Sequence, residues 1–327
     1  MDQFSIDAFT PLVKKAILRN LKIEESELND LGGFESFVFE RPANSSIIRM
    51  THVSHRDEEQ IQAELEFVYH LADTGAAVCK PLHFDDGKLI RVIDEFLISQ
   101  FERAPGKPTQ HEDWNNDLYQ RWGSCIGHFH TEANTMVNRQ FLRMKWDEDE
   151  NINFRARIPS DQESILQYAD DNLQSLSLLP QTKDVYGLIH CDAHIGNFFE
   201  KDDKLTFFDF DDCCYQWFVF DVATILLGAV IRPSIGLSRH EQNTAAIEFL
   251  KPFFDGYNRT FEVNAFMLEN MPLFLKTREL SLYAVILDHV GLENIKEEFP
   301  KRFMMGRQAR LLGDEPFLDI DFVETFG

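Results

Sequence analysis

Hydrophobic residues near the start of the chain recur at the spacing of a helix. Over residues 9–17 they fall on one face of an α-helix. Thr10 and Pro11 stand where this pattern begins, and a threonine before a proline is typical of an N-cap followed by the first helical position. The pattern therefore predicts a helix that begins at Pro11.

The next segments have the composition of β-strands. β-Branched and aromatic residues are frequent in them, and turn-forming residues at 41–44 and at Asp85-Asp86-Gly87 bound them. The predicted strands cover residues 34–40, 45–50, 88–93 and 95–101. A helix is predicted between the two pairs of strands. Ser54 and Asp57 resemble a capping box at its start, and it runs to Leu71 and ends near Gly75.

The segment Ala104-Pro105-Gly106-Lys107-Pro108 interrupts any regular element and is the predicted domain boundary. Beyond it the pattern becomes mainly helical. The predicted helices cover residues 114–131, 162–173, 220–231, 241–258 and 274–290. We therefore expect an α+β chain with a small β-rich domain over residues 1–103 and a larger helical domain over residues 104–327.

Composition narrows the possible partners. The chain has 327 residues, of which 44% are hydrophobic and 30 are Phe, so it can bury a sizeable core. Its net charge of -23, without a long Lys/Arg run, argues against a nucleic-acid partner. The same charge disfavours bare nucleotide, so a nucleotide site here requires magnesium and local basic groups.

Cysteine usage and hydropathy predict a cytoplasmic protein with no membrane partner. The five cysteines are odd in number and form no Cys-x-x-Cys motif, so reduced thiols are the simplest interpretation. The first residues lack the pattern of a secretory signal. The longest apolar run, 217–231, is too short to cross a bilayer and contains Asp221.

The richest candidate chemistry lies between two predicted helices. His190 and Asp192 form a His-x-Asp motif, Asn197 follows five residues after the aspartate, and Asp209 follows twelve residues after Asn197. This order and spacing are those of the catalytic and metal-binding loops of a kinase. Phosphoryl transfer needs a carboxylate that meets the acceptor hydroxyl, and Asp192 is the candidate. It also needs oxygen ligands for Mg²⁺, and Asn197 and Asp209 are the candidates.

The neighbouring residues leave further possibilities open. The apolar run 205–208 predicts a buried strand that delivers Asp209 rigidly. Asp211 and Asp212 could add metal ligands or shape the pocket, whereas His194 is interpreted as a loop-ordering or solvent-facing residue. A metal-dependent hydrolase is an alternative, with these side chains around a transition metal. Such sites usually need more histidines at fixed spacing, and Asn197 would have no clear role.

On these motifs the chain resembles the aminoglycoside phosphotransferase and choline kinase family, in its bacterial branch of homoserine-kinase-like and stress-response kinases. The resemblance implies a two-lobed protein-kinase-like fold, with a small β-rich N-terminal lobe and a larger helical C-terminal lobe. It implies Asp192 as the catalytic base, Asn197 and Asp209 as magnesium ligands, and His190 as support for the loop. The later tract from Trp217 matches the family's Trp-x-x-x-Asp-x-Ala, and the resemblance implies that Asp221 braces the catalytic loop.

The resemblance also places a nucleotide site in the first domain. Gly33 and Phe34 fall where the family has its phosphate-covering hairpin, although an ordinary hairpin turn accounts for two glycines equally well. Arg49 stands where the family commonly has lysine, and Glu64 is its expected helix partner. Arginine and lysine are not interchangeable at such a site, which leaves the details of nucleotide binding open. The backbone at Glu102 and Ala104 would hold the adenine edge.

The expected cofactors are ATP, with GTP as the alternative, and Mg²⁺, and the expected acceptor is a hydroxyl of a small molecule. Residues 145–171 carry eight acidic and three basic residues, and residues 311–327 carry five acidic and no basic ones. An acidic pocket would favour an amine-bearing acceptor, but a solvated acidic surface explains the same charges. A protein Ser/Thr kinase and a non-catalytic nucleotide-binding regulatory module remain alternatives. The absence of an Ala-Pro-Glu activation segment favours small acceptors.

Overall fold

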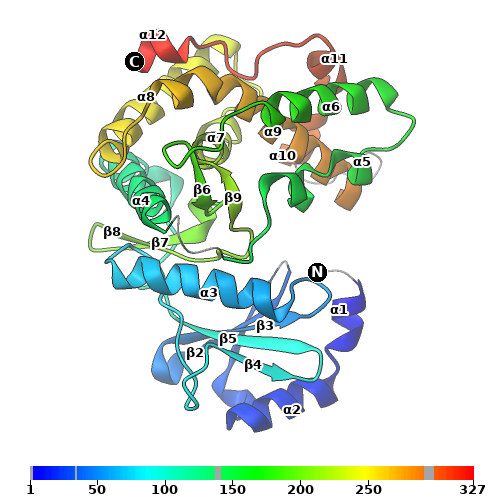
Figure 1. The fold of residues 1–327 in the computed structure, drawn as a ribbon, viewed down its shortest axis with the longest axis vertical. Helices are drawn as coiled ribbons and strands as arrows, with labels where there is room; N and C mark the ends of the chain where they lie inside the picture. Colours follow the sequence, from blue (N-terminus) through cyan, green and yellow to red (C-terminus); the bar gives the residue numbers. More distant parts are fainter. Residues whose placement is uncertain (1–2, 34, 137–140, 291–297) are drawn as a thin grey trace. The chain divides into compact units, whose positions relative to one another are not determined.

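The computed structural model describes residues 3–33, 35–136, 141–290 and 298–327 (Figure 1). Its contacts divide the chain into two compact units. The first unit comprises residues 1–107, 140–143 and 199–211, and the second comprises the remaining residues. The sequence-based division at residue 104 stays a prediction, and the two units are described separately below.

An antiparallel sheet forms the centre of the first unit. Its strand order is β1-β2-β3-β5-β4. The strands are β1 (Asn29–Gly32), β2 (Phe37–Arg41), β3 (Ser46–His52), β4 (Ile90–Ile93) and β5 (Phe96–Glu102). In the register of the sheet Arg49 lies between Val38 on β2 and Ser99 on β5. Arg49 therefore occupies the middle of the central strand.

Helices cover both faces of this sheet (Figure 1). Ile48 and Met50 of β3 point to one face and pack in a buried cluster with Ile17 of α2 (Pro11–Leu21). On the other face Leu97 of β5 packs with Leu65 of α3 (Glu58–Asp73). Because successive residues of a strand alternate between faces, Arg49 points to the α3 side. A short helix, α1 (Gln3–Ala8), precedes α2.

Local chemistry explains where the first helices begin. Thr10 caps α2 as predicted, and its hydroxyl accepts a hydrogen bond from the backbone N–H of Val13. The predicted capping box at Ser54 is wrong, because α3 begins after Asp57, which forms a capping box with Gln60. The Ser54 hydroxyl instead lies 2.8 Å from the ring of His52.

The predicted strands are confirmed within a few residues, and Asp85-Asp86-Gly87 forms a turn as predicted, in which the backbone N–H of Gly87 donates to the carbonyl of Phe84 at 2.9 Å. This turn precedes β4, and a separate tight turn joins β4 to β5. The tight connection between these strands falls at Asp94, whose φ of 52° is left-handed. Aspartate tolerates this region better than most residues, so it can take the place of a glycine there.

A hairpin late in the chain belongs largely to the first unit. It consists of β7 (Phe198–Lys201) and β8 (Lys204–Phe207). Phe207 is buried and forms a parallel bridge with Val78, and its carbonyl accepts from the backbone N–H of Cys79 at 2.8 Å. These bonds fix the end of β8, and Asp209 follows two residues later.

The second unit is mainly helical. Its one pair of strands among the described residues is β6 (Tyr186–Ile189) with β9 (Cys214–Trp217). Its longer helices are α4 (Asn116–Thr135), α6 (Glu163–Ser177), α7 (Phe218–Leu226), α8 (Arg239–Tyr257) and α9 (Ala265–Val290). Shorter helices are α5 (Phe154–Arg157), α10 (Glu298–Met304), α11 (Arg307–Leu312) and α12 (Phe322–Phe326). The predicted helices are confirmed, except that the end of the predicted helix 220–231 becomes a π-helical turn, Leu227–Ile231.

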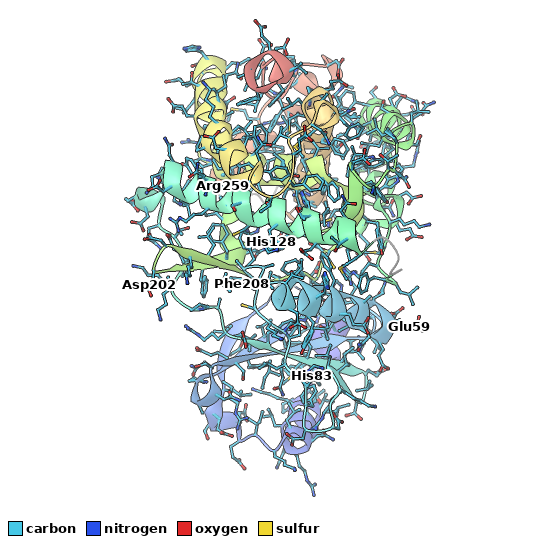
Figure 2. The ribbon with its side chains drawn as sticks, turned by 60° about the vertical axis from the view of Figure 1, so that its left-hand side comes forward. Glu59, His83, His128, Asp202, Phe208 and Arg259 are labelled. Atoms are coloured by element: carbon cyan, nitrogen blue, oxygen red, sulfur yellow. The ribbon has the colours of Figure 1, made fainter. Side chains whose placement is uncertain are left out.

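Helices α4 and α8 lie side by side, as both figures show; Figure 2 labels His128 on α4 and Arg259 just beyond the end of α8. A Cβ atom on Gly256 would lie 1.8 Å from the carbonyl oxygen of Gln120, so only glycine allows this close crossing.

The predicted α+β class is confirmed, with an antiparallel N-terminal sheet and a mostly helical remainder. Among the described residues no helix has both the length and the apolar character needed to cross a bilayer.

Candidate active site

The segment that follows β6 is held in a strained conformation by one buried carboxylate. Cys191 has a φ of 66°, in the left-handed region that costs a non-glycine residue about 1–3 kcal/mol. The backbone N–H groups of His190 and Cys191 donate to the two carboxylate oxygens of Asp221 at 3.2 and 2.8 Å. Asp221 thereby braces the loop that carries Asp192, which is the role that the resemblance implies for Asp221.

Two further buried side chains support Asp221. Nε2 of His130 lies 3.1 Å from Oδ2 of Asp221, and Nδ1 of His130 lies 2.7 Å from the hydroxyl of Tyr257. A carboxylate only accepts hydrogen bonds, so Nε2 carries the proton and Nδ1 accepts from the tyrosine hydroxyl. Burial raises the pKa of Tyr257 well above its usual value, which keeps the hydroxyl a donor. The sequence did not single out His130.

Asp192 has one carboxylate oxygen held and one left open. Oδ2 accepts from Nδ2 of Asn197 at 3.1 Å and lies 3.3 Å from Nε2 of His194. Nδ1 of His194 accepts from the backbone N–H of Gly196 at 2.9 Å, so in the neutral ring Nε2 carries the proton. Oδ1 of Asp192 has no hydrogen-bond partner in the described part of the chain. Because the side chain is one-third exposed, Oδ1 can receive a proton from a bound molecule.

Asn197 is oriented by the same loop. Its Nδ2 donates to both the backbone carbonyl and the carboxylate of Asp192, at 2.9 and 3.1 Å. These bonds fix the amide so that Oδ1, a hard oxygen acceptor, is left for another partner. His190 is buried, and its Nδ1 accepts from the backbone N–H of Asp192 at 3.4 Å. The geometry of His190 is that of a loop support.

The first unit contains a cavity of about 370 Å³, which falls in the range of small-molecule sites. Six candidate residues line it: Gly33, Arg49, Glu64, Glu102, Ala104 and Asp209. Apolar walls come from side chains such as Val68, Phe101 and Phe208. The backbone N–H of buried Ala104 has no partner among the described residues, so it remains available to a ligand. Phe34 lies outside the described residues.

Arg49 and Glu64 form a buried bidentate pair at this cavity. The two terminal guanidinium nitrogens of Arg49 donate to the two carboxylate oxygens of Glu64 at 2.8 and 2.7 Å. Burial would lower the pKa of Arg49, but the facing Glu64 carboxylate outweighs it and raises the pKa above its usual value. The Arg49 guanidinium also stacks 5.1 Å from the ring centre of Phe101. Glu64 therefore does not lie on a solvated helix face.

We expect Arg49→Lys to lower the free energy of unfolding by about 1–3 kcal/mol, because one ammonium cannot replace a planar fork on two oxygens. Urea unfolding followed by circular dichroism measures the change. Arg19→Lys, on an exposed part of α2, is the matched control and should be neutral. Equal stability of Arg49→Lys and the wild type would contradict a structural role for the bidentate pair.

The segment from Asp209 to Asp211 is fixed from several sides. Asp209 has a left-handed φ of 65°. The ring of Phe210 packs edge-on against the ring of Phe67 in α3, with 6.1 Å between the ring centres. The buried carboxylate of Asp211 lies 2.7 Å from Nε2 of His55 and 3.4 Å from Arg56. These positive neighbours occupy Asp211 and disfavour its use as an extra metal ligand.

The charges around Asp211 perturb two pKa values in opposite directions. Burial alone would raise the pKa of Asp211, but the hydrogen bond from His55 and the nearby arginines lower it below its usual range. Burial alone would lower the pKa of His55, but the bond to Asp211 raises it to about 9. His55 is therefore a cation at neutral pH.

The raised pKa of His55 predicts a pH dependence of stability. The folded-state pKa of about 9 exceeds the ordinary value of 6.5, so protonated His55 stabilises the fold fully below pH 6.5. This contribution is lost as the pH rises through 9. We expect the difference in unfolding free energy between wild type and His55→Gln to shrink over this interval. Urea titrations at several pH values measure it, and a constant difference would contradict the assignment.

Comparison with known proteins bears directly on this site. Residues 31–263 match the phosphotransferase enzyme family, APH. Amicoumacin kinase of Bacillus subtilis (strain 168) is 32% identical over 307 residues, which cover 91% of this chain and 90% of that protein. The structure of amicoumacin kinase hAmiN in complex with AMP-PNP, Ca²⁺ and Ami superposes with a TM-score of 0.89 at 27% identity, over 99% of both chains.

A more distant structure shows the shared fold alone. The microcompartment-associated aminopropanol kinase has a TM-score of 0.65 at 20% identity, and the match covers 87% of this chain and 90% of that one. The two matches reported above with more than 25% identity both carry the name amicoumacin kinase.

Proposed function

We propose that this chain, which belongs to the phosphotransferase enzyme family, transfers the γ-phosphate of ATP to a hydroxyl of a small molecule with the aid of Mg²⁺. One observation carries the proposal: Asp192 has one oxygen held by Asn197 and His194 and the other open on a partly exposed side chain. A general base needs this arrangement, since it must be fixed in orientation and still reach the proton that it removes.

Asp192 is proposed to orient the acceptor hydroxyl and to receive its proton. A hydroxyl that donates to Oδ1 has a lone pair directed away from the carboxylate and toward an incoming phosphorus atom. Asn197 and His194 keep the carboxylate from rotating, and the bonds of Asp221 to the backbone keep the loop in place. Phosphoryl transfer depends mainly on such positioning.

The cavity of the first unit is the proposed site of the nucleotide. The open backbone N–H of Ala104 suits an acceptor nitrogen of a purine, and the apolar walls suit its ring. Arg49 is proposed to act here where the family commonly has lysine, with Glu64 keeping it extended. ATP is the proposed nucleotide, and GTP is the competitor to test.

Asn197 and Asp209 are the proposed ligands of Mg²⁺. Oδ1 of Asn197 and the carboxylate of Asp209 are hard oxygen donors, which is the ligand type that this ion prefers. When bound, Mg²⁺ supplies positive charge that neutralises phosphate oxygens. The chain's own contribution is to hold both side chains still, through Asp192 on one side and through Phe210 and Asp211 on the other.

The proposed acceptor class is a small molecule with a hydroxyl and an amine. The acceptor named for the 32% identical relative, amicoumacin, is the first compound to test. The net charge of -23 favours the approach of a cation over that of an anion.

A phosphate-transfer screen tests this function. The purified chain is incubated with Mg²⁺ and labelled ATP or GTP, with amicoumacin, amino alcohols, aminoglycosides, sugars and a generic protein as acceptors. We expect label on one small hydroxyl compound and loss of transfer with EDTA. Transfer only to protein would favour the protein kinase alternative. Nucleotide binding without transfer to any acceptor would favour the regulatory module.

A further inference from the structure

Three side chains that are not proposed to touch nucleotide, metal or acceptor form a continuous series of contacts in the first unit. Oε2 of Glu35 lies 3.1 Å from Nε2 of His55, and the same nitrogen lies 2.7 Å from Oδ2 of Asp211. Glu35 belongs to the connection between β1 and β2, whereas Asp211 lies 156 residues beyond His55. His55 thus links a hairpin tip to the segment that carries Asp209.

The charges around Glu35, His55 and Asp211 argue against a metal site at these three residues. Glu35, His55 and Asp211 lie close enough together to hold an ion. However, Arg56 lies 3.4 Å and Arg49 3.9 Å from the Asp211 carboxylate, and these cations would repel a metal. The arginines complete the neutralisation of Asp211, so a proton on His55 balances the remaining carboxylate of Glu35.

Further hydrogen bonds hold the backbone at both ends of the Glu35–His55–Asp211 series. The backbone carbonyl of Asp211 accepts from Arg143, which also donates to the carbonyl of Gln60 in α3 at 3.2 Å. At the other end, the hydroxyls of Ser36 and Thr51 lie 2.8 Å apart and are buried, which ties the hairpin to β3. His55 is mostly buried between these anchors, whereas Glu35 is one-third exposed. The contact between Glu35 and His55 is therefore the one that can open, because Glu35 is the more exposed partner.

We propose that His55 is a positioning residue that fastens the β1–β2 hairpin to the Asp209–Asp211 segment through Glu35 and Asp211. The proposal rests on the proposed function, since it assigns the hairpin to the phosphates of the nucleotide and Asp209 to the metal. The fastened hairpin keeps Gly32 and Gly33 at the wall of the cavity that Asp209 also lines. When the link is lost, the nucleotide must order the hairpin as it binds, and its affinity falls.

The test uses His55→Gln and Glu35→Gln, which keep side-chain size and remove the charged link. Each has a matched control on an exposed position of the same unit, His83→Gln and Glu59→Gln, and Figure 2 labels both control residues. Hydrogen–deuterium exchange of peptides covering residues 30–36 reports on the hairpin without any need for turnover. Michaelis constants for ATP and kcat are measured with the same variants.

We expect faster exchange over residues 30–36 in both variants, a Michaelis constant for ATP raised about tenfold, and kcat changed much less. The double variant should be little worse than either single one, because one link is removed in each case. Unchanged exchange and an unchanged Michaelis constant would overturn the proposal. If the wild-type chain binds no nucleotide, the proposed function fails, yet the exchange rates still decide whether His55 fastens the hairpin.

Discussion

Replacing Asp192 by Asn lowers kcat by about a thousandfold, if this residue is the general base of the reaction. The amide has the size of the carboxylate, but it cannot take up the proton of the acceptor hydroxyl. Its oxygen can still accept from Asn197 and His194, so the loop keeps its shape. Affinity for nucleotide should therefore remain within about twofold of the wild type. Steady-state transfer assays and calorimetric titration with nucleotide measure the two quantities.

Asp202→Asn is the control for this experiment. Asp202 lies exposed in the turn between β7 and β8 with a φ of 50°, a conformation that asparagine also tolerates (Figure 2). It should leave both kcat and nucleotide affinity unchanged. A kcat of wild-type size in Asp192→Asn would show that another group removes the proton, and equal losses of kcat and nucleotide affinity would point to a damaged loop.

Local sequence signals predicted the elements well because their causes are local. Thr10 and Pro11 determine the start of α2 through a bond that spans three residues. The failure at Ser54 has a partly longer-range cause, because the Ser54 hydroxyl also lies 3.2 Å from the hydroxyl of Ser5, 49 residues away. Serine and aspartate can both cap a helix, and the ring of His52 engages the Ser54 hydroxyl, whereas Asp57 finds Gln60. A pattern that offers two caps does not reveal which one the tertiary structure uses.

The candidate site shows the same limit more strongly. The five-residue spacing of Asp192 and Asn197 places them in one loop, and the structure joins them by a hydrogen bond. The supports of that loop come from afar, because His130 lies 91 residues from Asp221 and 127 from Tyr257. A histidine on the otherwise apolar buried face of the amphipathic helix α4 was the only available signal for His130, and such residues usually serve the core.

The acidic stretch 145–171 is explained in part by structural roles. The Asp149 side chain accepts from the backbone N–H of Asn151 at 2.8 Å and is buried. Asp170 pairs with Arg155 within the second unit. Charges used for capping and pairing do not by themselves recognise a ligand, so the amine-bearing acceptor remains a prediction that only the transfer screen can test.

Asp221→Ala should lower the free energy of unfolding by about 3–5 kcal/mol, since it leaves several buried donors without an acceptor. These donors are the backbone N–H groups of His190 and Cys191 and Nε2 of His130, and Asp221 itself is fully buried. Tyr257→Phe, which removes one hydroxyl from the far end of the same network, should cost only about 1 kcal/mol. Urea unfolding of the three proteins measures both differences.

The conservative variant Asp221→Asn separates the loss of an acceptor from the loss of volume. Asparagine fills the space and offers one oxygen, but its NH₂ group then faces a backbone N–H, either of His190 or of Cys191. Two facing donors push the loop apart, and the left-handed strain at Cys191 loses its compensation. We therefore expect Asp221→Asn to recover less than half of the stability lost in Asp221→Ala. Its kcat should stay below that of the wild type, whereas its Michaelis constant for ATP should equal that of the wild type. Recovery of wild-type stability and kcat by asparagine would show that Asp221 acts as packing and does not orient Asp192.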